Sequence, residues 1–276
     1  MFDQINNDIV RFINSDGNEA LSLATGPESV PFRGSFLGAQ NKPEALARIK
    51  SKQTCALWLG SNPNVSSGLG SLRTGSSARN GVDAFRQQSE SDSVGHLLDC
   101  SSNPIKNQWD PIQRPAGPWK VYSDVLRETL GADSTVFMNY FPWGSSNLKE
   151  FRIEQPELFE RAVRFSDKTF KKVMSELKPN VLLIPFSLER EVRKGAGDAE
   201  VLVSILSETR DEHFILNNGR RFRWFSSVTS INQEAVLVLL VPHPSSIRLT
   251  KEGRIAVHKG LCSRIQGFLK DNSSDR

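Results

Sequence analysis

The sequence has little of several features that would place it in a familiar class of proteins. Its 276 residues include only three cysteines, an odd number spread widely along the chain: Cys55, Cys100 and Cys262. This set favours a reducing compartment over a disulfide framework, and it is too small for a four-cysteine iron–sulfur cluster. No apolar run approaches the roughly 20 residues of a membrane helix, and the N-terminus lacks the basic start and apolar centre of a signal peptide. We therefore expect a cytoplasmic protein without a membrane partner, nucleoid-associated if the cell is prokaryotic.

Length and composition are those of an ordinary globular protein. Hydrophobic residues make up 38% and charged residues 24% of the chain, and a chain of this length can bury a full core. The net charge of +4 permits a polyanionic partner without requiring one. We expect one domain over residues 1–272, with residues 1–53 as a helical layer and 65–114 as a long loop insertion. Long irregular insertions of this kind are typically functional loops. Residues 273–276 are expected to form a disordered tail.

The most informative stretch is an apolar run that ends in prolines. Seven consecutive apolar residues, Ala235–Val241, lead directly into Pro242-His243-Pro244. Such a run predicts a strand covered on both faces, which is typical of parallel sheets. The prolines stop the strand and restrict the backbone around His243. The histidine would therefore lie at the carboxyl end of the strand, where open α/β sheets bind ligands, although a surface histidine in a turn is the alternative interpretation.

Further strands alternate with helices along the chain. The patterns predict strands at 54–60, 134–141 and 180–186, and helices at 2–13, 42–50, 118–130, 157–177 and 260–269. Shorter helical pieces are expected at 83–88, 188–193 and 198–207, and a hairpin is expected at 213–217 and 221–228 around Asn217-Asn218-Gly219. This alternation predicts a three-layer α/β/α fold with a mostly parallel central sheet.

Parallel strands share one carboxyl edge, which gathers polar residues from three places in the chain. These are Gly60-Ser61-Asn62-Pro63, Asn139-Tyr140, and Pro242-His243-Pro244-Ser245. Two carboxamides and an imidazole can read the edge of a heterocycle, position a water and stabilise a departing anion, whereas the set contains no thiol nucleophile and no carboxylate pair. As alternatives, Asn62 could be a turn former and Asn139 could cap the next segment.

This pattern resembles the uracil-DNA glycosylase superfamily. That superfamily carries Gly-x-(Asp or Asn)-Pro after the first strand, Asn at the end of a middle strand, and His-Pro-Ser after the last strand. The order and strand context match over about residues 54–269. Asparagine in the first motif makes the chain more similar to the single-strand-selective and mismatch-specific enzymes than to the uracil-strict branch. One departure is Pro185-Phe186-Ser187, where the third strand of the superfamily often ends in a glycine-containing turn.

The resemblance implies a monofunctional DNA glycosylase that flips a nucleotide out of the helix and hydrolyses its N-glycosidic bond. Asn62 would position the attacking water, His243 would donate a hydrogen bond to the departing base, and Asn139 would bind the edge of that base. No lysine in the motifs could form a Schiff base, so the product would be an abasic site. No metal and no cofactor are expected.

The resemblance also implies which residues hold DNA, as duplex or as single strand. Ser245 and Ser246 would contact phosphate, and Ile247 or Arg248 would fill the gap left by the flipped nucleotide. We expect the protein to act on DNA as a monomer.

The base-facing side of the site is defined less closely. Asn64 stands where the uracil-strict branch has tyrosine, and its smaller size leads to the hypothesis that the pocket accepts a 5-substituted or hypermodified cytosine-type base as well as uracil. Tyr140 is a candidate for contact with the base, and Phe85, Trp109 and Trp143 are further candidates for stacking on it. The substrate could arise in DNA repair or in antiviral defence against modified phage DNA, and both remain open.

The sequence is compatible with two other functions and contains three weaker motifs. A catalytically inactive nucleic-acid-binding module and an unrelated hydrolase of small nucleosides are the rival functions. The segment 220–224 mixes arginine with aromatic residues, as nucleic-acid surfaces do, and a solvated hairpin is the alternative that we favour for it. His96 and Cys100 have the spacing of metal ligands but lack a second pair nearby, so we interpret them as coincidence. The glycine-rich segment 66–77 lacks the Gly-Lys-Ser/Thr ending of a nucleotide-binding loop.

Overall fold

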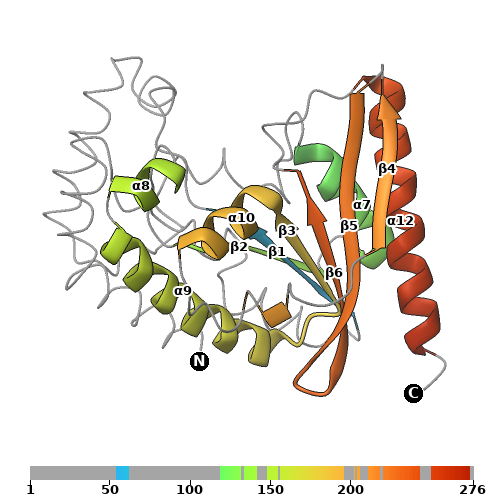
Figure 1. The fold of residues 1–276 in the computed structure, drawn as a ribbon. Coiled ribbons are helices and arrows are strands. Elements are labelled where there is room, and N and C mark those ends of the chain that lie inside the picture. The colour runs from blue at the N-terminus through green and yellow to red at the C-terminus, as the bar shows by residue number, and fades with distance from the viewer. Residues whose placement is uncertain are drawn as a thin grey trace, which may run out of the picture.

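The computed structural model describes a central sheet with helices on both faces (Figure 1). It describes residues 54–61, 119–131, 134–141, 148–154, 156–195, 202, 204–205, 211–217, 220–242 and 250–273. The strands are β1 (Ala56–Gly60), β2 (Thr135–Asn139), β3 (Val181–Pro185), β4 (Asp211–Asn217), β5 (Arg220–Ile231) and β6 (Glu234–Val241). The helices are α7 (Trp119–Leu130), α8 (Leu148–Glu154), α9 (Pro156–Leu177), α10 (Phe186–Gly195) and α12 (Lys251–Ser273).

The six strands form one sheet in the order β2-β1-β3-β6-β5-β4. The pairs β1–β2, β1–β3 and β3–β6 are parallel, whereas β6–β5 and β5–β4 are antiparallel. The sheet is thus mixed and mostly parallel, and the predicted α/β fold class is confirmed. The expected helices at 2–13, 42–50 and 83–88 and the expected insertion at 65–114 lie outside the described residues.

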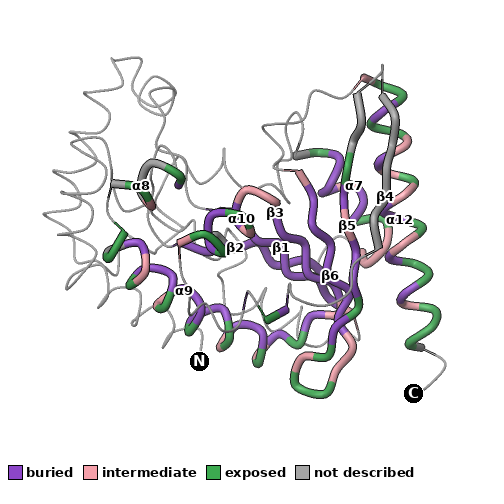
Figure 2. The backbone as a smooth tube through the Cα atoms, in the orientation of Figure 1, coloured by how far each residue is buried: buried purple, intermediate pink, exposed green. Residues whose placement is uncertain are grey.

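The helices divide into two layers that bury the two faces of the sheet. α8, α9 and α10 cover one face, and α7 and α12 cover the other. The residues of β1 and β3 are all buried, because both faces of these strands are covered (Figure 2). This double coverage explains why their sequences are continuously apolar rather than alternating. No helix in the described part of the chain is both long and apolar enough to cross a membrane.

The ends of two helices follow from residues that the sequence displays. α7 ends before Gly131, which has a φ of 94° and whose N–H donates to the carbonyl of Arg127 at 2.9 Å. Glycine adopts this left-handed conformation without the steric cost that a Cβ brings. α9 ends at Leu177, followed by Lys178 with a φ of 44° and then by Pro179. Both predicted helix ends are therefore confirmed.

The antiparallel half of the sheet was only partly predicted. The expected β4–β5 hairpin is present, with Asn217 paired to Arg220. β5 continues to Ile231 and turns into β6 through Asn232 and Gln233, whose φ values are 52° and 68°. Positive φ at both turn residues is the geometry of tight hairpin turns. β6 is consequently parallel to β3 on one side, as expected, and antiparallel to β5 on the other.

Two helices differ from the sequence-based expectation. α12 extends from Lys251 to Ser273, well beyond the expected 260–269, and it includes the first residue of the expected tail. Its buried residues Val257, Leu261, Ile265 and Phe268 follow helical spacing, so packing against the sheet outweighs the cost of the glycines within the helix. α8 was not anticipated, because seven residues are too few to show a clear period.

Asn180 joins three parallel strands at the amino edge of the sheet. Its side-chain oxygen accepts a hydrogen bond from the N–H of Cys55 at 3.1 Å, and its own N–H donates to the carbonyl of Cys55 at 2.9 Å. Its carbonyl accepts from the N–H of Leu237 at 2.8 Å. The starts of β1, β3 and β6 are therefore held together by one residue.

Candidate functional site

The carboxyl ends of β1 and β2 lie side by side. Gly60 pairs with Asn139 in parallel register. The pairing continues beyond the strands, because the N–H of Tyr140 donates to the carbonyl of Gly60 at 2.9 Å and that of Phe141 donates to Ser61 at 3.0 Å. The backbone of the first predicted motif is thus adjacent to the backbone of the second. The side chain of Asn139 lies outside what the structure describes.

The carboxyl end of β6 lies on the same edge of the sheet. Pro185 at the end of β3 pairs with Val241, and β3 lies between β1 and β6. At about 4.8 Å per strand, β1 and β6 end about 10 Å apart. Side chains from these two strand ends could contact opposite edges of one flat ring that lies between them.

This edge also contains the topological switch point of the sheet. The chain leaves β1 toward α7, which covers one face, and leaves β3 toward α10, which covers the other. Ligands of open α/β sheets bind in the crevice between two such strands. Here the ends of β1 and β3 are joined by the hydroxyls of Ser61 and Ser187, 3.4 Å apart. Ser187 belongs to the first turn of α10, which begins directly after Pro185 with no intervening loop.

Tyr122 fixes the backbone immediately before His243. Its hydroxyl donates to the carbonyl of Pro242 at 2.9 Å, and its ring packs edge-on against Trp58, with centroids 6.0 Å apart. Burial raises the pKa of Tyr122 well above its usual value, so the hydroxyl remains a hydrogen-bond donor. Tyr122 is therefore positioned to determine where the chain continues after β6.

Most of the predicted site residues follow these strand ends and lie outside the described residues. The structure therefore places the strand ends that carry them, and it does not place their side chains. The residues concerned are Asn62, Asn64, His243, Ser245, Ser246, Ile247 and Arg248.

Tyr140 has a different position from the one expected for contact with a base. Its side chain is fully buried in the core between the sheet and α9. The ring packs edge-on against Phe141 and Phe170, and the hydroxyl donates to Asp167 at 2.6 Å. Burial raises the pKa of Tyr140, and the charge of Asp167 and this hydrogen bond raise it further. A ring in this position has no free face for stacking, which favours a structural role over the expected base-binding one.

The arginine-rich segment of β5 is likewise divided between surface and core. Arg223 is exposed, and its guanidinium lies 4.5 Å from the centroid of the Phe225 ring. Trp224 is only 2% exposed and belongs to the core on the α7 and α12 side. A buried indole cannot stack on a nucleic-acid base, so of these two residues only Arg223 is exposed at the surface.

Two residues of the edge were missed by the sequence interpretation. Tyr122 is one of several apolar positions on α7. Ser187 belongs to the Pro185-Phe186-Ser187 segment, which was noted only as a departure from the family pattern. The hydrogen bonds they make connect residues more than 100 positions apart, and no local pattern reports such a pairing.

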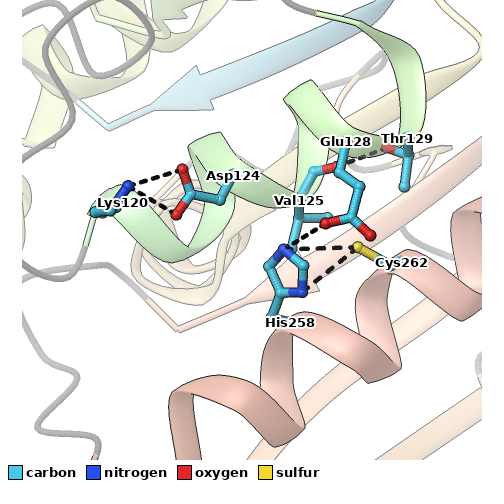
Figure 3. Close-up of polar contacts among 7 residues, drawn as sticks. All are labelled: Lys120, Asp124, Val125, Glu128, Thr129, His258 and Cys262. Atoms are coloured by element: carbon cyan, nitrogen blue, oxygen red, sulfur yellow. Dashed lines mark hydrogen bonds and ion pairs between the residues drawn. The ribbon is translucent and has the colours of Figure 1, made fainter. Parts of the chain in front are cut away.

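Among the described residues, one group of His, Cys and acidic side chains could hold a metal ion, and it lies between α7 and α12 (Figure 3). It comprises Glu128, His258 and Cys262. Glu128 is six residues beyond Tyr122 on α7, or about 9 Å along the helix axis. This group is therefore separate from the carboxyl edge. Comparison of the chain with protein-family models gave no match, and a search of curated proteins also gave none.

Proposed function

We propose that this protein is a monofunctional DNA glycosylase that acts in the cytoplasm as a monomer. It flips a damaged or modified pyrimidine out of DNA and hydrolyses the N-glycosidic bond, leaving an abasic site. The observation that supports this most is the shared edge, where Gly60 is paired with Asn139 and Pro242 ends β6 two strands away. These three backbone positions adjoin the three motifs that resemble those of uracil-DNA glycosylases.

The proposed reaction needs little activation of the nucleophile. Cleavage passes through an oxocarbenium-like sugar, so a carboxamide such as that of Asn62 suffices to orient the attacking water. Negative charge develops on the departing base, and His243 donates a hydrogen bond to its carbonyl oxygen. Loss of such a donor typically lowers kcat by about 10²–10³-fold. Asn139 binds the edge of the flipped base with its amide and thereby selects it.

The proposed substrate is uracil or a 5-substituted cytosine-type base, which includes the hypermodified bases of foreign DNA. Asn64, in place of a bulky aromatic residue, leaves space beside the 5-position. Ser245 and Ser246 contact phosphate, and Ile247 or Arg248 occupies the gap in the base stack. The net charge of +4 is compatible with a polyanionic partner.

The proposal is tested by incubating the protein with oligonucleotides that differ in one base. Uracil, hypoxanthine, 5-hydroxymethylcytosine and its glucosylated form are each placed in single strands and in duplexes, and abasic sites are scored by alkaline cleavage. We expect excision of at least one modified pyrimidine without direct strand cleavage. Excision of uracil combined with rejection of every 5-substituted base would refute the role of Asn64 and leave the glycosylase reaction intact.

Variants of the two catalytic candidates separate chemistry from binding. Asn62→Ala should lower single-turnover excision by about 10²–10⁴-fold, while its affinity for the same oligonucleotide, measured by fluorescence anisotropy, should change little. Affinity should fall steeply with salt, because phosphate contacts release counterions. A wild-type protein that binds DNA and excises no base would instead be a binding module. Salt-independent binding of free nucleosides would indicate a small-molecule hydrolase.

A further inference from the structure

Three side chains with metal-binding atoms meet on the side of the molecule formed by α7 and α12. Figure 3 shows Glu128 from α7 and His258 and Cys262 from α12 pointing toward one another. The Nε2 atom of His258 is 3.3 Å from the Oε2 atom of Glu128 and 3.9 Å from the Sγ atom of Cys262. One ligand atom from each of the three residues lies within 4.8 Å of the other two.

Two of the three separations are close to those imposed by a bound zinc ion. A tetrahedral zinc with bonds of about 2.0–2.3 Å separates its ligand atoms by about 3.3–3.8 Å. The imidazole nitrogen is already that far from the carboxylate, and the thiol sulfur is a few tenths of an ångström further from the nitrogen. Metal binding would still require the imidazole to rotate until one nitrogen points between the other two ligands, because both ring nitrogens are equally far from the sulfur. It would also require the flexible Glu128 side chain to move toward Cys262, since those two ligand atoms are only known to lie within 4.8 Å of each other.

The placement of the ligands on two packed helices keeps the three side chains close together. His258 and Cys262 are four residues apart on α12, a spacing that puts both side chains on one face of a helix. Glu128 approaches from the last turn of α7, and Val125 of that helix and Leu261 of α12 belong to the same buried cluster. The distance between the ligands is consequently set by core packing rather than by an exposed loop.

The three ligands differ in exposure. Cys262 is 5% exposed, while the side chains of His258 and Glu128 are 27% and 58% exposed. A cation could reach the sulfur past the two outer ligands and keep a water in the fourth position. Soft thiolate, imidazole and carboxylate together match Zn²⁺ and other thiophilic divalent ions better than Mg²⁺ or Ca²⁺, which prefer oxygen ligands alone.

A cysteine–histidine catalytic pair fits these contacts less well. Both ring nitrogens of His258 are 3.9 Å from the sulfur, so neither is aligned as a base toward it. Burial, together with the charge of Glu128, raises the pKa of the Cys262 thiol to about 11. A thiol of this kind is a poor nucleophile at neutral pH.

We propose that Glu128, His258 and Cys262 form a zinc-binding site that clamps α7 to α12. Binding exchanges the thiol proton of Cys262, which passes to solvent, for a sulfur–metal bond. The clamp would stabilise the folded chain by linking two helices that are more than 100 residues apart in the sequence. It is independent of the proposed glycosylase site, since it lies along α7 away from the carboxyl edge of the sheet.

The test uses tag-free, full-length protein that has been treated with a chelator and then titrated with Co²⁺. Tetrahedral cobalt bound by a thiolate gives a charge-transfer band in the near ultraviolet and d–d bands in the visible. We expect one equivalent of Co²⁺ to produce both, Zn²⁺ to displace it, and Zn²⁺ to raise the melting temperature. Absence of the charge-transfer band at stoichiometric Co²⁺ would overturn the proposal.

Matched variants identify the ligands. Cys262→Ser should abolish the charge-transfer band, whereas Cys55→Ala and Cys100→Ala should retain it, since Cys55 is on the opposite face of the sheet. Glu128→Gln changes an exposed side chain and should leave the fold intact, yet it should raise the Kd for Zn²⁺ by at least about tenfold, as loss of even an outer-shell partner does. A band that survives in Cys262→Ser, or an unchanged Kd in Glu128→Gln, would contradict this assignment.

Discussion

Replacement of Tyr122 by phenylalanine would test whether the carboxyl edge is held in place from α7. The substitution removes one hydroxyl and keeps the ring, so the edge-on packing against Trp58 is preserved. The lost interaction is the 2.9 Å hydrogen bond to the carbonyl of Pro242. That carbonyl belongs to the residue preceding His243. The perturbation therefore acts on the backbone of the proposed site without touching a proposed catalytic side chain.

The expected size of the effect follows from the surroundings of the bond. A typical intramolecular hydrogen bond contributes about 0.5–1.5 kcal/mol, and leaving a buried acceptor unsatisfied costs about 1–3 kcal/mol. Pro242 is only partly buried, so water can replace the hydroxyl in part. We therefore expect a loss of about 1 kcal/mol in the free energy of unfolding, equivalent to a fall of about 2–4 °C in the melting temperature.

The effect on excision should be larger than this loss of stability implies. A catalytic group displaced by about 1 Å can slow a reaction by about 10²-fold. Tyr122 acts only through the backbone before His243, so we expect single-turnover excision to fall by about tenfold at unchanged affinity for DNA. Urea unfolding followed by circular dichroism gives the stability, and excision of the best substrate gives the rate.

The control is Cys55→Ala, a change at the amino edge of the sheet. It removes the hydrogen bond from the Sγ atom of Cys55 to the carbonyl of Leu177 at 3.3 Å, and it should lower stability by a similar amount while excision is unchanged. Wild-type excision by Tyr122→Phe, or an equal loss of excision in both variants, would refute the reasoning. The expected loss of stability does not depend on which reaction the protein performs.

Two further substitutions probe the face covered by α8, α9 and α10, with α12 supplying a matched control. Burial acts to raise the pKa of Glu191, but the hydrogen bonds and charges of Arg152 and Arg190 outweigh it and leave the pKa below its usual value. Stability from this carboxylate is therefore present above the unfolded value of about 4.3 and is lost as pH falls through the lower folded value. Glu191→Gln should lower the free energy of unfolding by about 1–3 kcal/mol at pH 7. Urea unfolding should show this difference from the wild type becoming smaller below about pH 4, and a difference independent of pH would contradict the ion pairing. Gly195→Ala should destabilise by about 1–3 kcal/mol, because its Cβ would lie 2.7 Å from the Cδ atom of Arg152 and still closer to Phe159. In α12, a Cβ added at Gly267 would have no neighbour within 4 Å, so Gly267→Ala should stabilise the fold by about 0.5–1 kcal/mol. Thermal unfolding that showed both glycine variants to be stabilised, or both destabilised, would count against this packing argument.

The sequence predicted those elements whose signals are local. β1, β3 and β6 are short apolar runs, each preceded by a polar or cysteine residue, and proline ends the runs of β3 and β6. α9 combines a clear helical period with Pro179 after its end. The turn between β5 and β6 was missed because Asn232-Gln233 contains no glycine, although both residues adopt positive φ. The full length of α12 was missed because the expected helix began only at Gly260, whereas core packing maintains the helix from Lys251.

The candidate site was predictable to the extent that it depends on strand direction. Parallel strands align their carboxyl ends, so a shared edge for Gly60 and Asn139 was expected, whereas their direct pairing depends on a strand order that was not predicted. The burial of Tyr140 could have been anticipated, because Tyr140 directly follows β2 and continues the alternation of Val136 and Met138, with which it shares one core cluster. The hydrogen bond between Tyr122 and Pro242 joins residues 120 positions apart, and it depends on tertiary packing that no local pattern reports.

The junction at Asn180 has a consequence for the fidelity of the whole sheet. In a strand covered on both faces, every side chain is apolar, so a slip by one residue exchanges one apolar side chain for another and the hydrophobic pattern scarcely opposes it. A register-specific contact is supplied instead by the side chain of Asn180, whose oxygen accepts from the N–H of Cys55, beside two main-chain hydrogen bonds that connect Asn180 to Cys55 and Leu237. A slip at this end would carry the opposite ends of β1 and β6 along with it, each residue by about 3.3 Å. The alignment of Gly60 with Pro242 is thus encoded at the far edge of the sheet, by a polar residue that never approaches the proposed substrate.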